Sequence, residues 1–113
     1  MLARQFRLTS DKDYALVYRR GRRFRGPGFT CSVLSVTSPT RLGVVVSKKV
    51  SLKATVRNRY KRWLWAAVRD LKAAIPAQGY HLALSATPGI ATQTYQGIHQ
   101  ELERLFASLF RRA

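Results

Sequence analysis

Residues 54–75 read ATVRNRYKRWLWAAVRDLKAAI, and this stretch decides the fold. Its apolar side chains recur at helical spacing, which predicts a long amphipathic helix. The apolar stripe consists of Val56, Tyr60, Trp63, Leu64, Ala67, Val68 and Leu71. Pro76 closes this helix, because proline cannot continue one. A stripe of this kind needs an apolar surface to cover, so the rest of the chain is expected to supply a sheet.

Short segments on both sides of this helix have the composition of strands. Residues 29–37 and 42–46 are rich in β-branched and other apolar residues. The turn between them is short, which predicts that the two strands run antiparallel. Residues 80–86 predict a later apolar strand, and residues 22–25 are a candidate for a further one.

Two more helices are predicted near the ends of the chain. Ser10 followed by acidic residues is typical of a helix start, and Gly21 supplies the stop. Residues 94–111 carry a second apolar stripe, formed by Ile98, Leu102, Leu105, Phe106 and Leu109. The predicted order is helix, three strands, helix, strand, helix. We therefore expect one α+β domain over residues 1–113, an α/β sandwich in which a four-stranded sheet packs with three helices.

The chain is strongly basic. It has 21 Lys and Arg against 5 Asp and Glu, a formal charge of +16 and a pI of about 11.5. Sixteen of these cations fall within residues 4–25 or 41–62, whereas residues 73–100 contain no charged side chain. Such self-repulsion costs stability unless a polyanion relieves it. Nucleic acid is therefore the leading partner class, and an anionic membrane is the second.

Other functional classes find little support in the sequence. Cys31 is the only cysteine, and it forms no zinc-binding pattern with His81 or His99. The same residues make no recognisable nucleophile and base arrangement, so no catalytic residue and no metal site is assigned to the chain. Arg4 and Arg7 interrupt the start before any signal-peptide core develops. We expect a cytoplasmic protein that does not bind a membrane, since its apolar faces are needed for the core.

The densest group of cations is 57-RNRYKR-62, which follows Lys48, Lys49 and Lys53. Seven cations without an acid between residues 48 and 62 indicate phosphate binding rather than a merely solvated face. On a helix, one polar face collects Asn58, Lys61, Arg62, Trp65, Arg69 and Lys72. Asn58 has low helix propensity, and its paired donor and acceptor groups suggest a specific polar contact.

Three aromatic residues admit more than one interpretation. Trp65 falls among cations on the polar helix face, where it stacks on a base, packs on a neighbouring loop or covers arginine stems. Tyr14 and Tyr18 lie four residues apart on one face of the first helix. They form either half-buried core or an aromatic wall beside the arginines that follow, which would hold an extended single strand.

These segments together resemble the protein subunit of bacterial ribonuclease P over nearly the whole chain. The resemblance rests on Arg7-Leu8 with Asp13-Tyr14, Val17-Tyr18 and Gly21, on residues 41–49, and on Ala54 with Arg57-Asn58-Arg59 and Lys61-Arg62. Each segment alone is weak, because short basic motifs recur by chance. Their combination and order are specific.

The resemblance implies the accessory subunit of an endoribonuclease. The catalytic RNA, using bound Mg²⁺, would remove the 5′ leader of precursor tRNA, and no obligate protein partner is implied. By resemblance, the catalytic RNA binds Lys48, Lys49, Lys53, Arg57, Asn58, Arg59, Lys61 and Arg62. The leader strand binds between the first helix and the sheet, at Tyr14, Tyr18 and Ser32. The family fold also implies a left-handed βαβ crossover like that of a ribosomal-protein domain.

Some positions depart from the family pattern. Trp65 and Ala66 stand where Arg-Glu is common, so stacking or packing replaces an ionic contact there. Tyr14 and Tyr18 stand where phenylalanine is common, and Ser32 occupies a position that can be aromatic. The alternative is a general basic RNA-binding or ribosome-associated protein, which would share the salt dependence of RNA binding but not the substrate preference.

Overall fold

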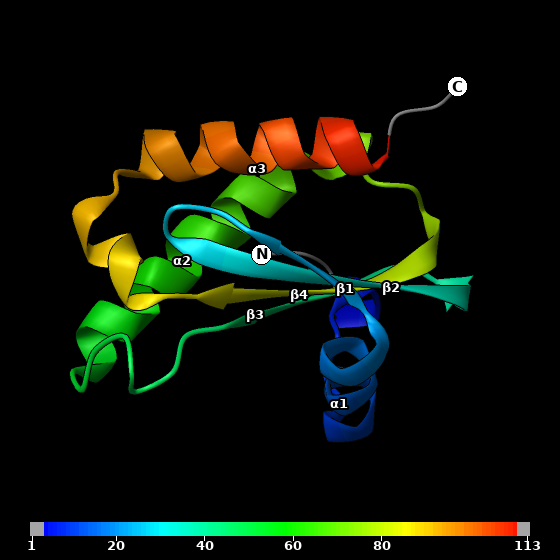
Figure 1. Ribbon diagram of the computed structural model, residues 1–113, viewed down its shortest axis with the longest axis horizontal. Helices are drawn as coiled ribbons and strands as arrows, with labels where there is room; N and C mark the ends of the chain where they lie inside the picture. The colour runs from blue at the N-terminus through cyan, green and yellow to red at the C-terminus, as the bar shows by residue number, and fades with distance from the viewer. Residues whose placement is uncertain (1–3, 111–113) are drawn as a thin grey trace.

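The computed structural model describes residues 4–110, and its elements follow the predicted order (Figure 1). The elements are α1 (Asp11–Arg20), β1 (Arg22–Arg25), β2 (Phe29–Pro39), β3 (Arg41–Val45), α2 (Ala54–Asp70), β4 (Gln78–Ala86) and α3 (Tyr95–Leu109). Short 3-10 turns occur at Arg4–Phe6, Lys72–Ala74 and Pro88–Thr92. The predicted α+β class is confirmed, and the predicted end of the last helix, Arg111, lies outside the described residues.

The strands form one mixed sheet in the order β1-β2-β4-β3. β2 pairs antiparallel with both β1 and β4, whereas β3 pairs parallel with β4, so that β3, α2 and β4 make a parallel β-α-β unit. The strands predicted at 29–37 and 42–46 do run in opposite directions, but they are not neighbours. β4 lies between them because it is apolar on both faces: Leu82, Ala83 and Leu84 are fully buried, as a central strand requires.

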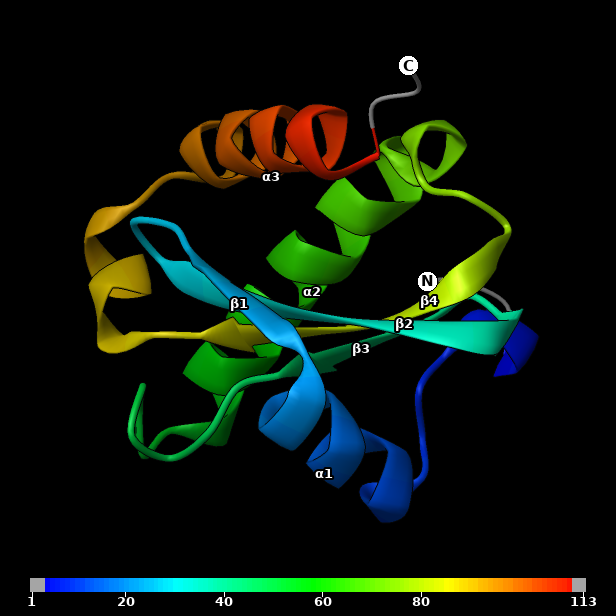
Figure 2. The ribbon, with the colours of Figure 1, turned by 45° about the vertical axis from the view of Figure 1, so that its right-hand side comes forward.

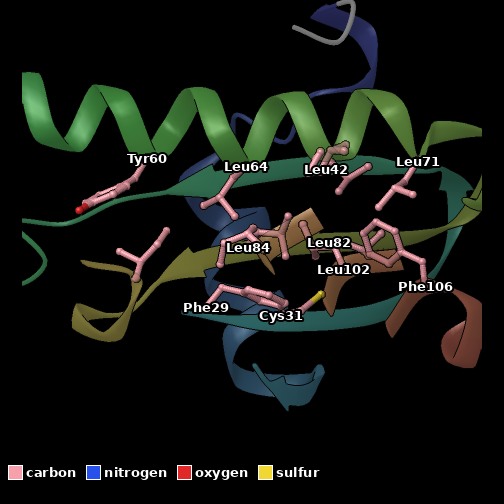
Figure 3. Close-up of a cluster of buried hydrophobic side chains, with 14 of the residues drawn as sticks. Phe29, Cys31, Leu42, Tyr60, Leu64, Leu71, Leu82, Leu84, Leu102 and Phe106 are labelled. Carbon is pink, nitrogen blue, oxygen red and sulfur yellow. The ribbon is translucent and has the colours of Figure 1, made fainter. Parts of the chain in front are cut away.

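The sheet is covered on both faces. α2 and α3 lie on one face and α1 lies on the other (Figures 1 and 2). Alternate strand residues point towards α2 and α3 and form the main core. Its buried members include Phe29, Cys31, Leu42, Tyr60, Leu64, Leu71, Leu82, Leu84, Leu102 and Phe106 (Figure 3). The long helix predicted from the 54–75 stripe therefore does cover the sheet.

A smaller core joins α1 to the opposite face. It consists of the buried residues Leu8, Val17 and Ala83, with Tyr14 and Leu34 packed against it. α1 begins as predicted, since the Ser10 hydroxyl accepts a hydrogen bond of 3.4 Å from the backbone N–H of Asp13. The helix has only 10 residues. A helix of this length does not cover the whole sheet face, so side chains of that face that α1 does not contact stay partly accessible to solvent.

α2 is shorter than the stretch that predicted it. The helix ends at Asp70, and Lys72–Ala74 forms a 3-10 turn. Ile75 is extended, with φ −101° and ψ 124°, because a residue before proline avoids the helical conformation. Pro76 thus ends the helical segment, as predicted, but the last turn is tightened rather than α-helical.

Candidate nucleic-acid interface

The residues predicted to bind RNA lie on the loop between β3 and α2 and on the first half of α2 (Figure 1). This set, named the basic surface, consists of Lys48, Lys49, Lys53, Arg57, Asn58, Arg59, Lys61 and Arg62. Arg57 is half-buried and the other seven residues are exposed. Within residues 4–110, none of its cations forms an ion pair. Their charges are therefore available to a polyanion.

Hydrogen bonds fix the loop of the basic surface. The Nη1 atom of Arg57 donates to the carbonyl oxygens of Ser51 at 3.0 Å and Leu52 at 2.9 Å. The Ser47 hydroxyl accepts a bond of 3.3 Å from the backbone N–H of Lys49. Bonds of this kind hold turns in place. Arg57 therefore shapes the loop that carries the lysines, a role that its place in the sequence motif did not reveal.

A pocket of about 600 Å³ lies along the outward face of α2. Its lining residues are Asn58, Lys61, Arg62, Trp65, Ala66 and Arg69. Five residues of the predicted polar face line this pocket, namely Asn58, Lys61, Arg62, Trp65 and Arg69. The sixth, Lys72, lies beyond the end of α2, and its Nζ is 4.3 Å from the centroid of the Phe6 ring. Trp65 is half-buried, because it packs against the main core while it lines the pocket.

Tyr14 and Tyr18 occupy different environments on α1. Their rings are stacked, with centroids 6.2 Å apart and an interplanar angle of 28°. Tyr14 is half-buried against the smaller core, and burial, followed by the neighbouring Tyr18, raises its pKa. Tyr18 is 38% exposed, and its hydroxyl lies in hydrogen-bond contact with Ser85 Oγ at 3.0 Å. Tyr14 thus belongs partly to the core, whereas Tyr18 presents its ring to solvent.

Ser32 was expected to be an outward residue of β2. It does lie on the sheet face that α1 covers, but its exposed fraction is only 3%. Accessible polar side chains on that face are Thr30 and Ser85, which pair across β2 and β4, with Arg25 of β1 opposite Thr30. Thr30 and Ser85 were not among the predicted site residues, although the alternation along β2 and β4 was an available signal.

The titratable groups outside the basic surface are scattered. Cys31 is fully buried, and burial raises the pKa of its thiol to about 12. Burial also lowers the pKa of His81 on β4, whereas His99 on α3 lies 3.7 Å from Asp70. Among the described residues, no three His, Cys, Asp or Glu side chains are grouped to hold a metal ion. What the charges and aromatic rings can do is bind phosphates and unpaired bases.

None of the helices in residues 4–110 is both long enough and apolar enough to span a bilayer.

The chain is similar to known proteins in both sequence and fold. The family model described as Ribonuclease P matches residues 2–109. The chain is 38% identical over 109 residues to the ribonuclease P protein component of a Pseudanabaena species, covering 95% of this chain and 93% of that protein. A Staphylococcus aureus RNase P protein has a similar fold, with a TM-score of 0.80, 24% identity and coverage of 94% and 98% of the two chains. For an RNase P protein from Thermotoga maritima the TM-score is 0.78 at 25% identity, with coverage of 90% and 96%.

Proposed function

Since the chain belongs to the ribonuclease P protein family, we propose that its basic surface binds the catalytic RNA of ribonuclease P. The family acts in the processing of the tRNA 5′ leader, and this chain is a protein component of that type. One observation carries the proposal: in the part of the chain that the structure describes, the cations of the basic surface have no acidic partner and are held on a helix and a braced loop. Such an array can neutralise phosphates with little loss of conformational entropy, because the loop is already ordered before binding.

A second surface takes the leader of precursor tRNA in this proposal. An extended single strand is held by stacking on exposed rings and by ionic contacts to its phosphates. Tyr18 offers the ring, and Thr30 and Ser85 offer hydroxyl groups on the adjoining sheet face. Exposed arginines of α1 and of the same face of β1 provide the charge, namely Arg19, Arg20, Arg23 and Arg25.

The hydrolytic step is assigned to the RNA partner and its Mg²⁺. Mg²⁺ takes oxygen ligands in a near-octahedral arrangement, and the carboxylates of the described residues do not converge to supply one. The protein binds the catalytic RNA and the precursor tRNA and orients the precursor. Its cations also neutralise phosphates of the two RNAs that would otherwise repel each other. This work belongs in the cytoplasm, and the chain is the accessory subunit of an endoribonuclease.

The test is leader cleavage of a precursor tRNA by a bacterial ribonuclease P RNA at low Mg²⁺. Reactions contain the RNA alone, the protein alone, or both together. We expect the protein to stimulate cleavage only when the RNA is present. Tight RNA binding without stimulation would overturn the proposal and favour a general RNA-binding protein.

A further inference from the structure

The pocket on the outward face of α2 has an aromatic residue among its lining cations. Lys61, Arg62 and Arg69 line the pocket together with Trp65. The helix repeat places these four side chains on one face. All three cations are exposed, and within residues 4–110 none of them forms an ion pair. Cations around an aromatic ring match a nucleotide, because its phosphates carry negative charge and its base has a flat apolar face.

The orientation of Trp65 is set by its surroundings. Part of the side chain packs against the main core, and the rest lines the pocket. A ring held in this way loses little rotamer freedom when it stacks on a ligand. Beside it, Ala66 has only a methyl group, so the neighbouring space stays open. Asn58 adds amide donor and acceptor groups that can meet the edge of a base.

We propose that this pocket binds an unpaired nucleotide of the RNA partner, with the base stacked on Trp65 and phosphates held by Lys61, Arg62 and Arg69. The nucleotide must be unpaired, because the bases of a duplex are stacked on each other and their faces are closed to protein rings. This inference rests on the proposed function, because the pocket shares Asn58, Lys61 and Arg62 with the basic surface that is proposed to bind the catalytic RNA. It assigns to Trp65 the stacking of a base, which cations alone do not provide.

The inference is tested first on the protein and short RNA. The chain has two tryptophans, so Trp63→Phe leaves Trp65 as the only one. The probes are a single-stranded oligoadenylate and an abasic oligomer of the same length. We expect saturable quenching of Trp65 fluorescence by oligoadenylate and much weaker quenching by the abasic oligomer. Equal quenching by both, or none by oligoadenylate, would overturn the inference.

The second arm uses the catalytic RNA. The Trp65→Leu substitution removes the ring and should weaken binding by roughly 5- to 100-fold, the range expected for loss of one base–aromatic stack. Trp65→Phe keeps a ring and should retain most of the affinity. Trp63→Phe is the matched control on the same helix, because Trp63 packs edge-on against Tyr60 and Tyr95, with centroids 5.3 Å and 6.5 Å away.

The outcomes separate this inference from the proposed function. If the wild-type protein does not bind the catalytic RNA, the proposed function fails. If the wild-type protein binds and Trp65→Leu binds equally well, only the stacking inference fails. Thermal unfolding of each variant shows whether it is folded, and a Trp65→Leu protein that melts like the wild type but binds weakly supports the site.

Discussion

At the residue scale, Arg57 contacts its own chain through the group that the sequence motif assigns to RNA. Its guanidinium holds the Ser51 and Leu52 carbonyls, and hydrogen bonds from charged donors are stronger than those between neutral groups. We expect Arg57→Ala to accelerate amide hydrogen exchange in residues 47–53 and to weaken catalytic-RNA binding about tenfold or more. The matched control is Arg59→Ala, because Arg59 is exposed. It should weaken binding without changing exchange, and unchanged exchange in Arg57→Ala would remove the positioning role.

The two tyrosines of α1 should differ when each is truncated. Tyr18→Ala removes an exposed ring, so we expect about fivefold or greater loss of affinity for precursor relative to mature tRNA, since one stacked base is lost. Tyr14→Ala should also lower the free energy of unfolding, because Tyr14 packs against the smaller core. Affinity measurements with both tRNA forms and with the catalytic RNA check this. Equal losses for all three RNAs would contradict separate surfaces.

His81 makes stability depend on pH in a definite direction. Burial lowers its pKa most; Arg41 also lowers it, whereas Asp13 acts in the opposite sense. Below the unfolded value of about 6.5, the unfolded chain binds a proton that the folded chain resists. The free energy of unfolding should therefore fall as the pH drops from 7.5 to 5.5. Urea unfolding at both pH values should show a smaller fall for His81→Gln, and an identical fall would refute the assignment.

At the element scale, the packing of α1 on the sheet depends on Gly43 of β3. A Cβ atom there would overlap the hydroxyl and ring of Tyr14. We expect Gly43→Ala to destabilise the protein by roughly 1–3 kcal/mol, the usual cost of overpacking. A double-mutant cycle by urea unfolding provides the control, because the same change made in Tyr14→Ala should cost much less. Additive effects would show that the two residues do not compete for space.

Local patterns predicted the elements of this fold but not the neighbours within its sheet. The short connection through Thr40 correctly indicated opposite directions for β2 and β3. Strand pairing is a long-range choice, however, and β4 takes the place between them because both of its faces are apolar. The length of α2 was overestimated, because the helix ends at Asp70 and is followed by a 3-10 turn at Lys72–Ala74. Pro76 accounts only for the extended conformation of Ile75.

The candidate site shows the same division between local and tertiary information. Charge clustering singled out the cations of the basic surface, and helical phase predicted the polar face of α2 that holds Trp65. Burial could not be read from the sequence, because it depends on which elements pack together. Ser32 is buried although it lies on the sheet face that α1 covers, as expected. Arg57 is half-buried although Asn58 and Arg59 beside it are exposed.

At the scale of the whole molecule, the charge of +16 is little compensated within the fold. In the described part of the chain, the close contacts between basic and acidic side chains are Arg104 with Glu101 at 3.3 Å and His99 with Asp70 at 3.7 Å. Neither includes a residue of the basic surface. The free protein therefore carries self-repulsion, against a net stability that is typically only about 5–15 kcal/mol for a domain. A bound polyanion relieves that repulsion and stabilises the fold by mass action.

This balance predicts that salt acts oppositely on the free protein and on its RNA complex. Raising salt should raise the melting temperature of the free protein by screening repulsion, and it should lower affinity for the catalytic RNA by reducing the gain from counterion release. Neutralising Lys48, Lys49 and Lys53 to glutamine should raise the melting temperature at low salt. It should also flatten the slope of log affinity against log salt by roughly 2–3, because each phosphate contact contributes about 0.7–0.9.

The control for this triple variant is Arg104→Gln, whose cation already pairs with Glu101 and which should leave the salt slope unchanged. Melting curves and RNA titrations across a range of salt concentrations measure both effects on the same samples. A triple variant that is stabilised but keeps the wild-type slope would show that these lysines repel their neighbours without touching RNA. The loop braced by Arg57 would then lie outside the RNA interface, and only the residues of α2 would bind the RNA.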